Sequence, residues 1–148
     1  MPILETTDPE IHARSGIHVY QYYMSNCAQR VCLALEEKGL DWTSHSVNLF
    51  TQENTKDAYF KINPKGLVPS MIHDGVVITE SMDILRYIEE QFPEPALYPS
   101  EPTQRQQVDK WMDLATDNHL GVVKTYMYSL AFGASKKLGC KFNVCYEK

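Results

Sequence analysis

The feature that most constrains the fold is the stretch LVPSMIHDGVVIT, residues 67–79. Its two apolar runs flank Asp74-Gly75, and this dipeptide between such runs is a strong short-range signal for a β-hairpin. Val68-Pro69 stands where the first run begins, and proline lacks the N–H that an interior strand residue donates. We therefore expect two antiparallel strands, with the proline at a strand end or edge. The pattern alone predicts a trans Val68–Pro69 bond, because only about 5% of X–Pro bonds in folded proteins are cis.

The segments around this hairpin predict a helix between two strands and a further helix after the hairpin. Residues 17–24, IHVYQYYM, are rich in β-branched and aromatic residues and predict a strand that ends at Ser25-Asn26. The run AQRVCLALEEKG that follows has apolar residues at helical spacing and a glycine at its end. A weaker strand, a short helix and a longer amphipathic helix are predicted at residues 41–49, 51–62 and 81–92. The order βαβ, short helix, ββα indicates an α/β domain, a small mixed sheet flanked by helices.

Composition and charge exclude several classes of partner. The chain has 148 residues, 43% of them apolar, which is enough for one packed domain or for a small domain plus part of another. Its 19 acidic and 14 basic residues give a net charge of −5 without a basic stripe, so we expect no nucleic acid. No apolar run approaches the roughly 20 residues that span a bilayer, and the first residues are unlike a signal peptide. We expect a cytoplasmic protein with no membrane partner.

The cysteines do not form a metal-binding pattern. Cys27 and Cys32 are separated by four residues, as are Cys140 and Cys145. This spacing matches neither a CxxC motif nor a zinc ligand pair. In a helix, two residues five positions apart also lie on well-separated faces. We therefore expect no metal and no local disulfide.

Several features together resemble the glutathione transferase superfamily over residues 17 to about 130. They are the βαβ–ββα order, Val68-Pro69, Glu80-Ser81 before a helix, a proline-rich linker and a helical continuation. The most specific part is INPKGLVPSMIHDGVVITES. The resemblance implies a thioredoxin-like N-terminal domain with a cis proline and an all-α C-terminal domain. It also implies a transferase that joins glutathione, as co-substrate, to a small electrophile, commonly as a homodimer.

The resemblance and the linker PEPALYPSEPT together suggest the domain organisation. We expect the helical domain to be incomplete, because members of the family continue through several more helices. The expected parts are an N-terminal extension, a glutathione-binding domain, a linker and a partial helical domain, at residues 1–16, 17–93, 94–102 and 103–148.

The resemblance assigns glutathione-binding roles to Val68, Pro69, Glu80 and Ser81. The strand end at Val68 offers its amide and carbonyl to the cysteinyl part of glutathione, as in strand addition. The Ser81 amide at a helix start suits the γ-glutamyl carboxylate, and Glu80 suits the γ-glutamyl ammonium. Taken singly, Ser81 is more simply a helix cap and Glu80 a solvated carboxylate.

One position departs from the family pattern. Many relatives carry Gln or Lys just before the valine, whereas this chain has Leu67. We therefore expect one contact to the glutathione backbone to be missing. Lys65, Gln52 and Lys56 remain alternatives for binding the glycine carboxylate.

The stretch YMSNCAQR places Ser25 and Cys27 at the start of a helix, where unpaired amides and the helix dipole stabilise an anion. The resemblance is to serine-type transferases, in which the serine hydroxyl donates to the glutathione sulfur and lowers the thiol pKa.

The same stretch is similar to the zeta-class transferases and to the tetrachlorohydroquinone reductive dehalogenases, in which the cysteine resolves a mixed disulfide. Cys27 has two open interpretations, a resolving thiol and a small packed residue. Two alternative functions therefore stand beside conjugation: a glutathione-dependent reductase or dehalogenase that uses Cys27, and a non-catalytic interaction module. The module is suggested by Leu67 and the short helical part.

Overall fold

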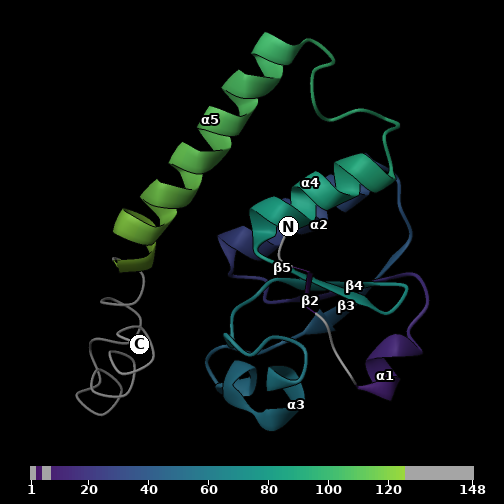
Figure 1. The fold of residues 1–148 in the computed structure, drawn as a ribbon. Helices are drawn as coiled ribbons and strands as arrows, with labels where there is room; N and C mark the ends of the chain where they lie inside the picture. Colours follow the sequence, from purple (N-terminus) through teal and green to yellow (C-terminus); the bar gives the residue numbers. More distant parts are fainter. Residues whose placement is uncertain (1–2, 5–7, 126–148) are drawn as a thin grey trace. The chain divides into compact units, whose positions relative to one another are not determined.

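The computed structural model describes residues 3–4 and 8–125 (Figure 1). The chain divides into two compact units, Met1–Tyr98 and Pro99–Lys148. The predictions that concern Cys140, Cys145 and the last part of the helical domain lie outside the described residues.

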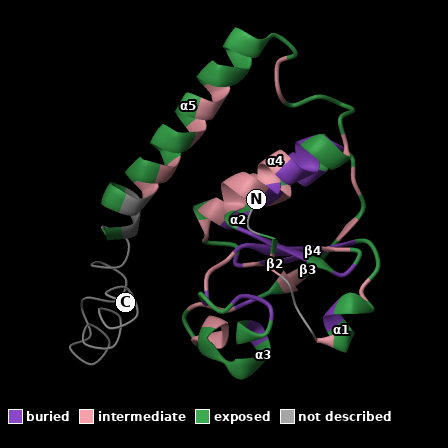
Figure 2. Ribbon diagram, viewed as in Figure 1, coloured by how far each residue is buried: buried purple, intermediate pink, exposed green. Residues whose placement is uncertain are grey.

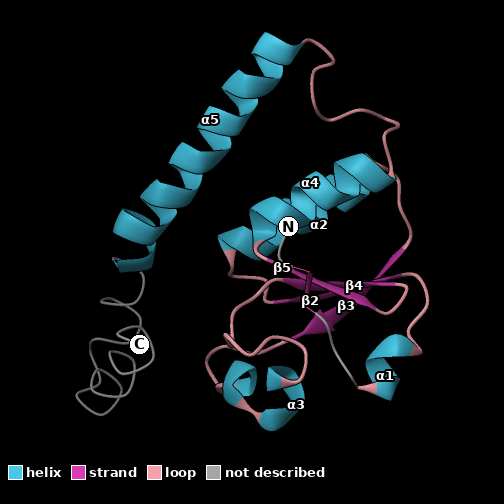
Figure 3. Ribbon diagram, in the orientation of Figure 1, coloured by secondary structure: helices cyan, strands magenta, loops and turns pink. Residues whose placement is uncertain are grey.

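Unit 1 contains a five-stranded mixed sheet and four α-helices among its described residues (Figure 3). The sheet order is β1-β5-β4-β2-β3, with β2 and β3 parallel and the other neighbours antiparallel. The strands are β1 (Ile3–Leu4), β2 (Ile17–Gln21), β3 (Trp42–Ser46), β4 (Ser70–His73) and β5 (Val76–Thr79). The helices are α1 (Pro9–His12), α2 (Asn26–Glu37), α3 (Asp57–Phe60) and α4 (Ser81–Gln91), with a 3-10 turn at Glu53–Thr55. The expected βαβ–ββα order is present, preceded by β1 and α1, which the sequence pattern did not predict.

Unit 2 begins with α5 (Pro102–Asn118) and continues into a π-helical segment, His119–Lys124. Pro102 stands at the start of α5. The first N–H groups of a helix have no intrahelical acceptor, so a proline, which lacks this N–H, is well tolerated there. The Glu101 carboxylate caps the helix by accepting hydrogen bonds from the amides of Thr103 and Gln104, at 3.0 and 2.9 Å. These bonds hold the pKa of Glu101 below its ordinary value.

The strand alternation of unit 1 creates two cores, one on each face of the sheet (Figure 2). Val19 and Met71 face α2 and α4, whereas their neighbours Tyr20 and Ile72 face the opposite side. The first core consists of Ile17, Val19, Val31, Leu35, Met71, Ile78, Ile84, Tyr87 and Ile88. The second, toward α1 and α3, consists of Ile11, Tyr20, Val47, Tyr59, Ile62, Ile72 and Val77. The sheet is therefore the middle layer of three.

The predicted hairpin is confirmed, and β4 and β5 pair in antiparallel register across Asp74-Gly75. Both turn residues have positive φ, 48° and 80°, as the turn type that suits the strand twist requires. A side chain on Gly75 would stand 2.8 Å from the carbonyl oxygen of His12. The turn consequently packs against the end of α1, and only glycine fits there.

The Val68–Pro69 bond is cis. The expectation from pattern alone, a trans bond, is therefore wrong, whereas the cis bond implied by the family resemblance is confirmed. The isomer follows from how the loop enters β4, which a base rate for X–Pro bonds does not contain.

A buried ion pair joins the end of α2 to α4. The Nζ atom of Lys38 lies 2.7 Å from Oε2 of Glu89, and the two side chains are 0% and 8% exposed. Lys38 also donates to the carbonyl oxygens of Phe92 and Pro95, at 2.7 and 2.9 Å. All three hydrogens of the ammonium thus have an acceptor.

The carboxylate of the same pair is equally well satisfied. Glu89 accepts hydrogen bonds from the amides of Leu97 and Tyr98, at 3.3 and 3.1 Å. Burial by itself raises the pKa of Glu89, but the hydrogen bonds from Lys38, Tyr98 and Leu97 outweigh it and hold the pKa below its ordinary value of 4.5. The pair fastens the chain segment that follows α4 to the rest of unit 1.

Candidate functional site

Three strand ends meet at one edge of the sheet. Tyr20 of β2 pairs with Ser70 of β4, which in turn pairs with Thr79 of β5, so these residues form one row. Beyond this row, β2 leads to Ser25, Val68-Pro69 leads into β4, and β5 leads to Glu80-Ser81. The topology therefore brings the residues predicted for the site to the same edge.

Ser25 is the N-cap of α2. Its backbone is extended, with φ −85° and ψ 109°, and its Oγ accepts a hydrogen bond from the amide of Ala28 at 3.3 Å. Capping uses the serine oxygen as an acceptor. The hydroxyl hydrogen remains a donor, because a hydroxyl has one donor and two acceptor sites. The half-buried Ser25 is thus able to cap the helix and to donate to a ligand at the same time.

Cys27 lies in the first turn of α2, half-buried and with a free thiol. Both interpretations of this residue remain predictions. Cys32, one turn further on, packs against the first core, and burial raises the pKa of its thiol. A raised pKa suppresses the thiolate, the reactive form of a cysteine.

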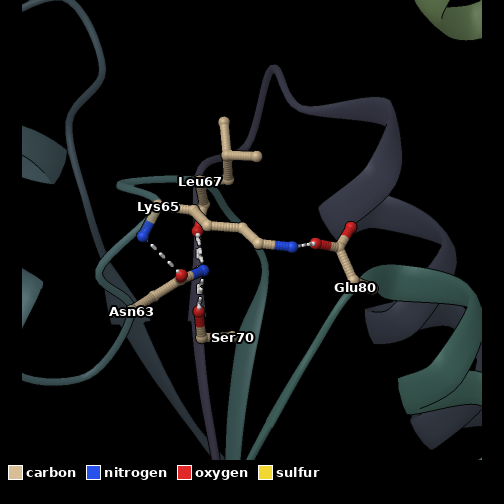
Figure 4. Close-up of polar contacts among 5 residues, drawn as sticks. All are labelled: Asn63, Lys65, Leu67, Ser70 and Glu80. Atoms are coloured by element: carbon tan, nitrogen blue, oxygen red, sulfur yellow. Dashed lines mark hydrogen bonds and ion pairs between the residues drawn. The ribbon is translucent and has the colours of Figure 1, made fainter. Parts of the chain in front are cut away.

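A buried hydrogen-bond network holds the loop before the cis proline (Figure 4). The carbonyl oxygen of Leu67 accepts from Tyr59 Oη at 2.6 Å and from Asn63 Nδ2 at 2.9 Å. Both side chains also contact Ser70 Oγ, at 2.9 and 3.0 Å. Burial raises the pKa of Tyr59 far above its usual range, so the phenol stays protonated. The network fixes the direction of the Leu67 carbonyl.

Sequence reasoning missed this network. The pattern of residues 51–62 predicts a short helix that includes Tyr59, and it predicts no role for Asn63. An asparagine beside a proline is the typical signal for a turn. That signal does not indicate that Asn63 will be only 2% exposed, or that its side-chain amide will donate a hydrogen bond to the carbonyl of Leu67.

Val68 differs from its neighbours in its backbone bonding. In the described part of the chain, its amide and carbonyl take part in no hydrogen bond, and the β4 ladder begins only at Ser70. A backbone amide and carbonyl without protein partners at a strand end are a site where an extended peptide can add.

Glu80 is the N-cap of α4, and Ser81 is its first helical residue. The N-cap position weighed for Ser81 from the sequence is therefore occupied by Glu80. With φ 66° and ψ 113°, Glu80 has a backbone conformation that is uncommon for a residue with a side chain. Such strained residues cluster at functional sites. The Ser81 amide belongs to the first turn, whose N–H groups have no intrahelical acceptor.

The side chain of Glu80 does not cap the helix. Instead, its Oε1 lies 2.6 Å from Nζ of Lys65. The Lys65 side chain extends from the loop before the cis proline toward the start of α4 (Figure 4). Lys65, one of the three alternatives for the glycine carboxylate, therefore engages Glu80. Arg30 of α2 reaches the start of α4 as well, with Nη1 3.3 Å from Sδ of Met82.

Residues 3–4 and 8–125 contain no group of three or more His, Cys, Asp or Glu side chains arranged to hold a metal ion. No helix in this part of the chain is both long enough and apolar enough to cross a membrane.

Comparison with known proteins identifies similar chains. Residues 24–91 match the family model described as glutathione S-transferase, N-terminal domain. A maleylacetoacetate isomerase from Pseudomonas aeruginosa is 41% identical over 90 residues, which is 59% of this chain and 42% of that protein. A zeta-class glutathione S-transferase from Euphorbia esula is 40% identical over 85 residues, or 57% and 38% of the two chains.

A solved glutathione S-transferase structure is also similar to this chain. The theta-class glutathione S-transferase from Xanthomonas axonopodis pv. citri, with glutathione bound, superposes with a TM-score of 0.70 at 32% identity. The superposition covers 78% of this chain and 56% of that one. The chain spans about two fifths of the length of the two curated relatives. Residues 24–91 are therefore a glutathione S-transferase N-terminal domain with the thioredoxin-like fold.

Proposed function

We propose that unit 1 binds glutathione and activates its thiol for attack on a small electrophile. The observation that carries the proposal is the meeting of Ser25, Val68 and Glu80-Ser81 at one edge of the sheet. These segments offer a hydroxyl, an unbonded backbone strand end and a helix start beside a carboxylate. A tripeptide with a thiol and a zwitterionic end has groups that match each of them.

The proposed contacts follow the chemistry of the tripeptide. The cysteinyl backbone pairs with the amide and carbonyl of Val68, next to the cis Pro69. The γ-glutamyl carboxylate binds at the Ser81 amide, where the helix start favours negative charge. The γ-glutamyl ammonium binds the Glu80 carboxylate through a charge-assisted hydrogen bond.

In this proposal Ser25 stabilises the thiolate and does not attack. Its hydroxyl donates to the glutathione sulfur, while its oxygen keeps the bond from Ala28. A donor to the charged form lowers the pKa of the bound thiol. The thiol proton passes to solvent, the thiolate forms a bond to the electrophilic carbon, and the leaving group departs with the bonding electrons.

A second candidate function uses the same thiolate. The similarity to a maleylacetoacetate isomerase favours cis–trans isomerisation of a conjugated double bond. A thiolate that adds to such a bond allows rotation about it and is then expelled, so glutathione is regenerated. Consumption of glutathione distinguishes conjugation from isomerisation.

Calorimetric titration of the full chain with reduced glutathione tests the binding proposal. We expect saturable binding to one site, and a weaker affinity at neutral pH for S-methylglutathione, which has no thiolate for Ser25 to bond. A Lys61→Met variant serves as a control, because the Lys61 side chain is 65% exposed and pairs with Asp8, and neither residue is among the proposed glutathione contacts. Absence of glutathione binding in the folded protein would contradict the proposal and favour the non-catalytic module.

The reductase alternative makes a separate prediction about Cys27. In this role the substrate is a mixed disulfide between glutathione and an aryl thiol. The Cys27 thiolate attacks the glutathione sulfur of this disulfide, forms a Cys27–glutathione disulfide and releases the aryl thiolate. A second glutathione then reduces the protein and leaves as glutathione disulfide. Mass spectrometry of the protein after turnover with a glutathionyl aryl disulfide should find the adduct on Cys27. A Cys27→Ser variant should lack it and a Cys32→Ser variant should keep it; an unmodified Cys27 would count against this role.

A further inference from the structure

The ion pair between Lys65 and Glu80 lies inside the site proposed for the glutathione amino group. Nζ of Lys65 is 2.6 Å from Oε1 of Glu80. This is the distance of a charge-assisted hydrogen bond. The carboxylate proposed to receive the ligand's ammonium therefore already binds an ammonium of the protein (Figure 4).

Both ends of this pair start from fixed backbone. The amide of Lys65 donates to Asn63 Oδ1 at 3.0 Å, and the next carbonyl, that of Gly66, accepts from Asn54 Nδ2 at 2.8 Å. A side chain on Gly66 would stand 3.0 Å from the carbonyl oxygen of Asn54, so the loop packs closely there. On the other side, the position of Glu80 is set by the turn between β5 and α4. The loop therefore holds the lysine stem within reach of the carboxylate.

An internal ammonium changes what the site gains from a ligand's amino group. A ligand ammonium must displace Lys65 from Glu80 or share the carboxylate with it against the repulsion of two like charges. A ligand without an amino group leaves the Lys65–Glu80 pair in place. The Glu80 carboxylate then still has Lys65 as its partner when the ligand's own carboxylate binds nearby. The amino group thus contributes less to binding than it would at an unpaired glutamate.

We propose that Lys65 acts as an internal competitor for the ligand ammonium at Glu80, and that it sets the ligand class of this site. The inference rests on the proposed glutathione site. The class comprises γ-acyl-cysteinyl peptides with or without a free amino group, bound with affinities that differ little. Lys65 is in this sense a specificity-determining residue.

The size of the effect follows from the exposure of the pair. The side chains of Lys65 and Glu80 are 62% and 44% exposed. Exposed ion pairs contribute little, so removal of the competitor changes the affinity by about two- to five-fold. The change is expected only for ligands that carry the ammonium.

The test compares glutathione with glutaryl-cysteinyl-glycine, which keeps the carboxylate and lacks only the amino group. Calorimetric titrations use the wild-type chain, Lys65→Met, Lys65→Arg and Lys61→Met, each verified as folded by circular dichroism. Lys65→Met retains most of the apolar stem and removes the charge. Lys65→Arg keeps the charge, and Lys61→Met removes an exposed lysine that pairs with Asp8.

We expect Lys65→Met to bind glutathione about two- to five-fold more tightly and the glutaryl analogue no more tightly than the wild-type chain. Lys65→Arg and Lys61→Met should resemble the wild-type chain. Unchanged glutathione affinity in Lys65→Met would overturn this inference alone, and weaker affinity would overturn it by assigning Lys65 a direct contact with the ligand. If none of the folded chains binds either ligand, the proposed function fails and this inference fails with it.

Discussion

A Ser25→Ala variant is expected to bind glutathione with a thiol pKa about 1–2 higher than in the wild-type complex. A hydrogen bond to a charged group contributes about 1.5–3 kcal/mol, and one pKa unit corresponds to about 1.4 kcal/mol. Since only the thiolate attacks, conjugation of an aromatic chloride at neutral pH should slow by about 10- to 100-fold. The ultraviolet absorbance of the bound thiolate, followed against pH, measures the pKa without depending on turnover.

The capping role of Ser25 requires a matched control, because alanine removes both the donor and the cap. Loss of a serine N-cap to alanine costs about 0.5–2 kcal/mol, whereas glycine at this position costs only a few tenths. Ser25→Gly therefore removes the hydroxyl and keeps most of the stability. Equal pKa increases in the two variants would support the donor role. A thiol pKa that stays at the wild-type value in Ser25→Gly would refute it.

A Lys38→Met variant is expected to lower the free energy of unfolding by about 3–5 kcal/mol. Removal of one partner from a buried pair leaves the other charge uncompensated, and Glu89 is only 8% exposed. Urea unfolding at neutral pH measures the loss. Lys61→Met, which breaks an exposed pair with Asp8, should change stability by less than about 1 kcal/mol. A double variant Lys38→Met, Glu89→Leu should recover much of the loss, and equal instability of the single and double variants would show that the charge of Glu89 is not its cause.

The same pair predicts a pH dependence of stability. The pKa of Glu89 is lower in the folded chain than its ordinary value of 4.5. Its contribution is therefore complete above that value and declines as the pH falls through the folded pKa. Between neutral pH and about pH 3.5 the wild-type chain should lose more stability than the Lys38→Met, Glu89→Leu variant, which has no carboxylate at this position. A parallel decline of both proteins would assign the acid sensitivity to other carboxylates.

Local signals predicted most elements of unit 1. Asp74-Gly75 marked the hairpin, and both residues have the positive φ that such a turn needs. The helix after Ser25 ends before Gly39, whose φ of 62° suits the glycine stop. The strand predicted at residues 17–24 is three residues longer than β2, because Tyr22 and Tyr23 have strand-like side chains but belong to the turn before α2. Propensity describes a residue's preference and carries no information about where its ladder ends.

The two short N-terminal elements were not predicted because they depend on distant partners. Ile3 and Leu4 form a strand only by pairing with Ile78 and Val77 of β5. α1 is four residues long, too short to be stable by itself, and contributes Ile11 to the second core. The amide of Gly16 also bonds the Asp74 carboxylate at 2.7 Å. Elements of this size are stabilised by tertiary contacts, which a local pattern does not contain.

By itself the sequence determined the hairpin, the amphipathic helices, and the residue types at Ser25, Val68 and Glu80, because each depends on neighbours within a few positions. Only the tertiary structure decided that these residues meet at one sheet edge, since strand register joins segments dozens of residues apart. It also decided the buried Lys38–Glu89 pair and the contact of Lys65 with Glu80. The sequence shows that a residue is a charged lysine, whereas the exposure of that lysine and its ion-pair partner depend on how the chain packs.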